Sequence, residues 1–276
     1  MSEETYKIYP TPDLDSPTGV YIPNNLEEAI VELEKMIPVS LKLKLEIDAI
    51  AKYHLSLGLW LRNNWCLGQN NNLVQYFVNY GASSQADTIS TLLLTLYQRY
   101  LQRPLADAEE NLTDVDLFKF VNETYRRLIG CDRATLWILD SLKNELVTKV
   151  NLPEKAQDIR IPTNASYMGK VLESCESLNL PFDFYFYHNS ENIKQLDLKL
   201  GYRHCSILVM PVQETDGTIM GVIQLINKKK PSVFSSYDPA NYPQPPECWQ
   251  ASFTKDDITL LERRNQQLVT LLNRYQ

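Results

Sequence analysis

The sequence predicts an α+β protein in which an all-helical domain, residues 23–104, precedes a sheet-based domain, residues 112–276. Three observations favour this class. Apolar residues recur at helical spacing from about 24 to 103, where strand-like alternation is absent. Short β-rich runs begin near residue 134, and Asp216-Gly217 between two apolar runs is a hairpin signal, because glycine permits a positive φ. A length of 276 residues accommodates two small domains.

The N-terminal part is expected to be an extended arm, residues 1–22, followed by four helices. The arm is polar and contains several prolines, so it is unlike a segment with its own core. The first helix is expected to start after a cap at Asn24 or Asn25 and to end before Pro38, and Asp87 is the expected cap of the fourth. The other helices are expected over about 41–65, 72–80 and 87–101. A polar linker, residues 105–111, follows.

The second half begins with a predicted helix over about 114–129, which Thr113 can cap. Its last predicted helix, 255–274, starts at Thr254, and Asp257 completes a capping box there. The predicted strands are the runs 134–139, 145–150, 158–161, 206–212 and 218–226, with short helices over about 167–174 and 193–200 and a Pro-rich loop over 229–252.

Charge and missing motifs exclude several classes of function. The chain has 27 Lys+Arg against 34 Asp+Glu, and a net charge of −7 argues against nucleic-acid and membrane partners. Its N-terminus lacks a signal peptide, and its five cysteines are scattered without a Cys-x-x-Cys pair, which favours a cytoplasmic location. The three histidines lack metal-ligand spacing, and there is no phosphate loop or nucleophile elbow. We therefore expect no metal, no cofactor and no catalytic residues.

Five stretches of the second half resemble, in their order and spacing, a GAF domain, the small-ligand-sensing module of bacterial and eukaryotic signalling proteins. The stretches are CDRATLWILD (131–140), NELV (144–147), IRIP (159–162), GYRHCSILVMPV (201–212) and DGTIMGVIQLINK (216–228). The resemblance covers residues 112–274. It implies an antiparallel sheet of about six strands, with terminal helices on one face and a ligand pocket on the other.

The variety is similar to the GAF domains of cyanobacterial sensor kinases and cyclases and of cyclic-nucleotide phosphodiesterases. Their Asn-Lys, Phe and Asp-Glu motif falls here on Asn227, Lys228, Phe253 and Asp257. Ile258 replaces the final Glu, which weakens the inference of a cyclic-nucleotide ligand. We expect Lys228 and Asp257 to form a surface ion pair that joins the last strand to the last helix and contributes about 0–1 kcal/mol.

The aromatic segment 178–189 is expected to be a loop beside the implied pocket. The candidate ligand-binding residues are Phe184, Tyr185, Tyr187, Cys205 and Ser206. Aromatic side chains with polar ends suit a flat ligand of mixed polarity, and the alternative is that these side chains fill the pocket themselves. A covalent bilin is not expected, because the family attaches it through Cys-His or Asp-x-Cys-Phe, whereas the order here is His204-Cys205.

The helical domain resembles a small bacterial domain family of unknown function, through HLSLGLWLRNNW at 54–65 and DTIS at 87–90. This resemblance implies no known activity. Arg62 and Asp87 can form a buried fork pair, which is a structural interpretation. The alternative is a polar recognition site made of His54, Arg62, Asn63 and Asp87.

Together these features predict a non-enzymatic regulatory protein of signal transduction, whose GAF domain senses a small ligand, dimerises, or both. Two domains use up the 276 residues, so output is expected through contact with another protein. The last helix carries an apolar stripe typical of pairing in a homodimer, with Arg263, Arg264 and Gln266 outside it, unless the stripe covers the chain's own sheet. The stripe is Ile258, Leu261, Leu268, Leu271 or Leu272, and Tyr275. The alternatives are a ligand-free adaptor and, more remotely, a cysteine-dependent reductase or a bilin photosensor.

Overall fold

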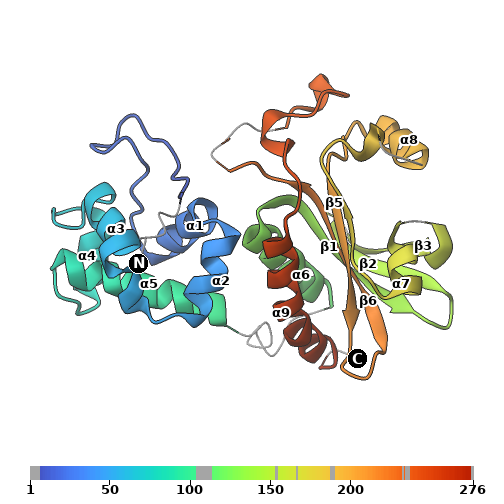
Figure 1. Ribbon diagram of the computed structural model, residues 1–276, viewed down its shortest axis with the longest axis horizontal. Helices are drawn as coiled ribbons and strands as arrows, with labels where there is room; N and C mark the ends of the chain where they lie inside the picture. The colour runs from blue at the N-terminus through green and yellow to red at the C-terminus, as the bar shows by residue number, and fades with distance from the viewer. Residues whose placement is uncertain are drawn as a thin grey trace. The chain divides into compact units, whose positions relative to one another are not determined.

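The computed structural model describes residues 7–103, 114–152, 155–165, 167–186, 190–231, 233 and 237–274. The chain divides into two compact units, Met1–Arg103 and Pro104–Gln276 (Figure 1). The linker expected over 105–111 lies outside the described residues, as do Thr113 and Tyr275. The predicted α+β class is confirmed, because the first unit is helical and the second contains a six-stranded antiparallel sheet with flanking helices.

The first unit is a set of helices around α5 (Ala86–Gln102), which packs against α1, α2 and α3. The other elements are α1 (Leu26–Met36), α2 (Val39–Ile47), η1 (Ile50–Tyr53), η2 (His54–Gly58), α3 (Leu59–Asn64) and α4 (Asn72–Asn79). The predicted cap of α1 is confirmed for Asn25, whose side-chain oxygen accepts the Glu28 N–H at 2.9 Å.

The single helix predicted over 41–65 is wrong. The backbone is extended at Asp48 and Ala49, and the Asp48 carboxylate accepts hydrogen bonds from Lys52 and Tyr53 at 2.7 Å. The Gln98 side-chain amide also donates to the Leu45 and Asp48 carbonyls, which satisfies the end of α2, and the chain continues as a 3-10 turn and a π-helical turn. The cap predicted at Asp87 is also wrong, because Gln85 is the N-cap residue of α5.

The described part of the arm, residues 7–22, is anchored to α1. The backbone N–H and the hydroxyl of Thr11 donate to the Glu32 carboxylate at 2.7 and 2.8 Å. Tyr21 donates its hydroxyl to Glu28 at 2.6 Å, and Asn24 adds further bonds. These hydrogen bonds, the one from Tyr21 foremost, lower the pKa of Glu28 to about 2.

The second unit is built on a sheet with the strand order β3-β2-β1-β6-β5-β4, in which neighbouring strands are antiparallel. The strands are β1 (Cys131–Asp140), β2 (Glu145–Leu152), β3 (Lys155–Pro162), β4 (Leu178–Leu180), β5 (Ile207–Gln213) and β6 (Ile219–Lys228). The predicted hairpin between β5 and β6 is confirmed, with Gly217 at φ 93°. Figure 1 shows α6 (Asp114–Ile129) and α9 (Lys255–Leu272) on one side of the sheet and α7 (Tyr167–Ser174) on the other.

The segment predicted as a loop over 178–189 is partly ordered, because it contains β4 and the turn η5 (Phe184–Phe186). It leads into α8 (Glu191–Leu200), which ends at Gly201 with φ 57°, as predicted. The short turn η4 (Thr163–Ala165) precedes α7. The long loop after β6 contains two more turns, η6 (Pro239–Asn241) and η7 (Glu247–Trp249).

Helix α9 begins with the predicted capping box of Thr254 and Asp257. Its stripe residues Leu261, Leu268, Leu271 and Leu272 are buried within the unit. The stripe therefore covers the chain's own domain, which was the alternative to pairing with a second copy. The expectation that Arg264 lies outside is wrong, since this side chain is buried as well.

Candidate functional site

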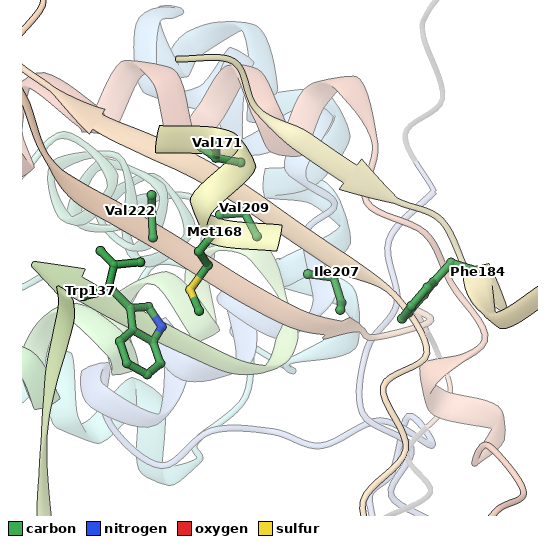
Figure 2. Packing of buried hydrophobic residues seen from close by; sticks show 8 residues of the cluster. Trp137, Met168, Val171, Phe184, Ile207, Val209 and Val222 are labelled. Carbon is green, nitrogen blue, oxygen red and sulfur yellow. The ribbon is translucent and has the colours of Figure 1, made fainter. Parts of the chain in front are cut away.

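The sheet face that carries α7 holds an apolar cluster, which we call the α7 cluster (Figure 2). Its buried members are Trp137, Leu146, Met168, Val171, Phe184, Ile207, Val209 and Val222. Figure 2 shows Trp137 and Val222 from adjacent strands beside Met168 of α7, with Ile207 and Phe184 farther along the sheet. This face corresponds to the side on which the resemblance places a ligand pocket.

Polar groups interrupt the α7 cluster. Trp137 donates its indole N–H to the side-chain oxygen of Gln224 at 3.3 Å. Thr148 lies two residues beyond Leu146 in β2, so its side chain is on the same face. Thr148 is 1% exposed, and its hydroxyl has no hydrogen-bond partner among the described residues. A buried hydroxyl without a partner costs about 1–3 kcal/mol, so a group that bonds to it would be stabilising.

The aromatic candidates divide between the interior and the edge of the α7 cluster. Phe184 is buried inside it, and Tyr185 packs against its margin, with the two rings edge-to-face at 5.3 Å. Tyr187 lies outside the described residues. Phe186 points away from the core, since it is 79% exposed.

Cys205 and Ser206 belong to the framework beside this face rather than to the α7 cluster. Cys205 is buried in a second cluster with Tyr202, Ile226, Cys248 and Trp249. Burial raises the pKa of its thiol to about 12. The Ser206 hydroxyl accepts the Lys228 backbone N–H at 3.0 Å. The structure thus separates these two residues from Phe184 and Tyr185.

The Asn of the sequence motif fastens the segment that precedes β5. Asn227 has a left-handed backbone at φ 58°, and its side chain is fully buried. Its side-chain oxygen accepts the Cys205 N–H at 2.7 Å, and its amide donates to the Tyr202 hydroxyl at 3.0 Å and to the Arg203 carbonyl at 2.9 Å. The Asn227 side chain therefore holds the segment before β5 at three residues, Tyr202, Arg203 and Cys205.

The predicted ion pair of Lys228 and Asp257 forms, with Nζ and Oδ1 2.7 Å apart, but it is not on the surface. The Lys228 side chain is 11% exposed and that of Asp257 is fully buried. Lys228 also donates to the Ile129 carbonyl, and Asp257 accepts the Thr254 N–H at 2.7 Å. Phe253 is buried beside this start of α9. The estimate of about 0–1 kcal/mol for a surface pair therefore does not apply, because both charges of this pair are largely removed from water.

Sequence reasoning missed two polar contacts near the α7 cluster. The Arg203 guanidinium lies over the Tyr185 ring, with its carbon 3.8 Å from the ring centroid, and donates to Asp183 at 2.7 Å. The His204 N–H donates to the buried Asp197 carboxylate at 2.7 Å, and the His204 ring makes a second, short bond to it. The only sequence signal was the polar pair 203–204 just before an apolar strand.

The polar cluster of the first unit is a network around Arg62. Its Nε lies 3.0 Å from the Asp87 carboxylate, and its two terminal nitrogens donate to the Ser90 hydroxyl and the His54 carbonyl. The His54 ring lies 3.8 Å from Asp87, whereas Asn63 is exposed. Every guanidinium nitrogen is paired within the unit, which favours the structural interpretation over a recognition site.

Within the described ranges, no group of three or more His, Cys, Asp or Glu side chains is arranged to hold a metal ion. Among the same residues, no helix combines the length and apolar character that crossing a membrane requires. All five cysteines are free thiols, and Cys175 is exposed.

Comparisons with known protein families match both units. Residues 116–263 match the model of the GAF domain, and residues 22–101 match a family described as a domain of unknown function, DUF6794. The chain is 30% identical over 127 residues to a dual cyclic-AMP and cyclic-GMP phosphodiesterase 11 of Drosophila melanogaster, covering 40% of this chain and 8% of the relative. It is 35% identical over 74 residues to a cGMP-specific phosphodiesterase of Drosophila virilis, covering 27% and 8%. The chain thus spans less than a tenth of these relatives' length.

Solved structures similar to this chain include a GAF domain from an Acinetobacter phosphoenolpyruvate-protein phosphotransferase. That match has a TM-score of 0.41 and 16% identity, and it covers 59% of this chain and 84% of the other. Another is a free methionine-R-sulfoxide reductase from Neisseria meningitidis in complex with its substrate. Its TM-score is 0.39 with 16% identity, covering 62% of this chain and 82% of the other.

Proposed function

The chain belongs to the GAF domain family, and on this basis we propose that its second unit binds a small molecule on the α7-cluster face and acts as a regulatory module without catalysis. The observation that carries the proposal is the buried Thr148 hydroxyl, which has no hydrogen-bond partner among the described residues and lies in β2 two residues from Leu146 of the α7 cluster. A ligand polar group at this position removes the energetic cost. Gln224 offers a second polar group on the same face.

The environment of the thiols supports a protein without cysteine catalysis. Burial raises the pKa of both Cys131 and Cys205 to about 12, so neither is a thiolate near neutral pH. A cysteine reductase needs a reactive, accessible thiolate. Replacing Cys175 by Ser tests the exposed thiol, and loss of a methionine sulfoxide reductase activity present in the wild type would contradict a non-enzymatic role.

The experiment for ligand binding is native mass spectrometry of the full chain purified from its own source. We expect a retained small molecule in the wild type and a reduced retained fraction in Thr148→Val, which keeps the shape of the side chain and removes the hydroxyl. A wild type that retains no molecule and binds neither cAMP nor cGMP in calorimetry would contradict the proposal. The two cyclic nucleotides are included because of the relatives' names, although Ile258 departs from the motif.

The second candidate is a ligand-free adaptor, which two observations favour. Phe184 already occupies part of the α7 cluster. Helix α8 buries Asp197 but leaves Leu196, Leu198 and Leu200 between 45% and 63% exposed, as in a surface that contacts another protein. In either case we propose that output occurs through contact with another protein. We propose a cytoplasmic location, since the five free thiols suit a reducing compartment. We also propose that the chain forms a homodimer, which sedimentation would measure.

A further inference from the structure

A stacked pair of side chains at the edge of the α7 cluster holds two buried polar atoms without partners. These are Nε of Arg203 and the hydroxyl oxygen of Tyr185. Neither has a hydrogen-bond partner in the part of the chain that the structure describes. Unpaired buried polar atoms are rare in native proteins, so each one needs an explanation, such as a bound water, ion or ligand that bonds to it.

The pair is held rigidly by the surrounding backbone. Asp183 has a left-handed backbone at φ 62°, and its N–H donates to the Cys205 carbonyl at 2.9 Å, which ties the start of η5 to the segment before β5. The Ser190 hydroxyl donates to the Tyr185 carbonyl at 3.2 Å, and Asn227 fixes the Arg203 carbonyl. The two side chains therefore meet in a preformed arrangement rather than by chance on a mobile surface.

The Arg203 side chain uses only part of its donor set. One terminal nitrogen bonds to Asp183, the planar group stacks on Tyr185, and the side chain is 13% exposed. The Nε–H has no acceptor among the residues that the structure describes. Because Arg cannot lose its proton, this donor needs an acceptor whenever the site is dry.

We propose that Arg203 and Tyr185 form the subsite of the ligand-binding face that recognises a neutral carbonyl oxygen, such as that of an amide or a ring lactam. The inference rests on the proposed function, since it concerns the same face, and it names the class of ligand. At Arg203 itself a neutral acceptor is favoured over a carboxylate, because Asp183 already balances its charge at 2.7 Å; the Lys194 ammonium lies farther off, 5.6 Å from the Tyr185 ring centroid. The Tyr185 hydroxyl provides a second donor or acceptor.

The test uses benzamide as a neutral carbonyl probe and benzoate as its charged counterpart, titrated into the ¹⁵N-labelled full chain. The Nε–H signal of Arg203 is assigned from its absence in Arg203→Lys. We expect benzamide to shift this signal saturably and benzoate to bind about tenfold more weakly.

Two variants remove one hydrogen bond each. Arg203→Lys keeps the charge beside Asp183, and Tyr185→Phe keeps the ring. Each is expected to weaken benzamide binding about tenfold. Arg160→Lys and Tyr80→Phe are matched controls at solvent-accessible positions and leave binding unchanged.

Several outcomes overturn the inference. Benzoate that binds as well as benzamide, an Arg203 Nε–H signal that benzamide does not move, or a crystal structure with only water at these two atoms would each contradict it. Native mass spectrometry separates this failure from failure of the proposed function. A retained molecule present equally in wild type, Arg203→Lys and Tyr185→Phe refutes the subsite but leaves ligand binding intact, whereas an empty wild type that binds no probe refutes both.

Discussion

The buried ion pair at the start of α9 makes Lys228→Met the most informative single substitution. Methionine keeps the length and apolar stem of the side chain, so the change removes the ammonium and little else. The Asp257 carboxylate, fully buried, would then keep its bonds from Thr254 but lose its cation. Breaking a buried pair by removing one partner costs about 3–5 kcal/mol, because the remaining charge stays desolvated.

The exposed pair of Lys230 and Glu247 provides the matched control. Its atoms are 3.2 Å apart, and its side chains are 44% and 63% exposed. Lys230→Met is therefore expected to cost no more than about 1 kcal/mol. For a domain of this size each kcal/mol lowers Tm by roughly 2–4 °C, so Lys228→Met predicts a fall of roughly 6–20 °C.

The assay is differential scanning calorimetry of the full chain, with the transition of the second unit followed separately if the two units unfold independently. Lys228→Met combined with Asp257→Asn should recover part of the loss, because Asn is neutral and still offers the cap an acceptor. Equal falls in Tm for Lys228→Met and Lys230→Met would refute the argument that desolvation makes this pair strong.

Three further substitutions or treatments give defined outcomes. The pKa of Glu28 is about 2 in the folded chain, below its ordinary value of 4.5. The stability that its carboxylate contributes is therefore fully present at pH values above 4.5 and is lost as the pH falls from about 5 toward 2. Urea unfolding at pH 7 and pH 3 should show this loss in the wild type and not in Glu28→Gln, at about 1 kcal/mol because solvent partly screens the group. Iodoacetamide at pH 8 should label Cys175 rapidly and Cys205, whose pKa is about 12, only after unfolding, as counted by mass spectrometry. Gly221→Ala places a Cβ 2.0 Å from a β1 carbonyl and should cost more than about 4 kcal/mol, whereas Gly68→Ala meets nothing within 4 Å and should stay within about 0.5 kcal/mol by circular dichroism melting.

The elements of the fold could be predicted where local sequence decides them. The capping box of Thr254 and Asp257 spans four residues, and the hairpin at Gly217 needs only a turn residue between apolar runs. The break of the helix at Asp48 could not be predicted from spacing, because the apolar residues of 39–47 alternate with polar ones and this pattern does not report where a helix ends. The carbonyls at the end of α2 are instead satisfied by the Gln98 side chain, about 50 residues along the chain, which is a tertiary contact.

The candidate site could be predicted only as a face of the sheet. The density of aromatics identified Tyr185, but its partner Arg203 lies on a segment whose approach depends on tertiary structure. Thr148 carries no signal in the sequence, since only its burial and its missing partner distinguish it from other strand threonines. The environment of an atom is a property of the packed fold, and no spacing rule reports it.

The adjacent residues Asn227 and Lys228 link the segment that carries Arg203 to the start of α9. Asn227 holds the segment of Arg203, and Lys228 holds the start of α9 through Asp257, so a ligand that shifts the first has a two-residue route to the second. Asn227→Gly tests this route, because glycine accepts the φ of 58° while the three side-chain bonds are lost. We expect benzamide to change amide hydrogen exchange in the first turn of α9 in the wild type and not in Asn227→Gly, provided that both bind the probe. An equal change in the two proteins would show that α9 responds by another path, and no change in either would show that α9 is not an output of this face.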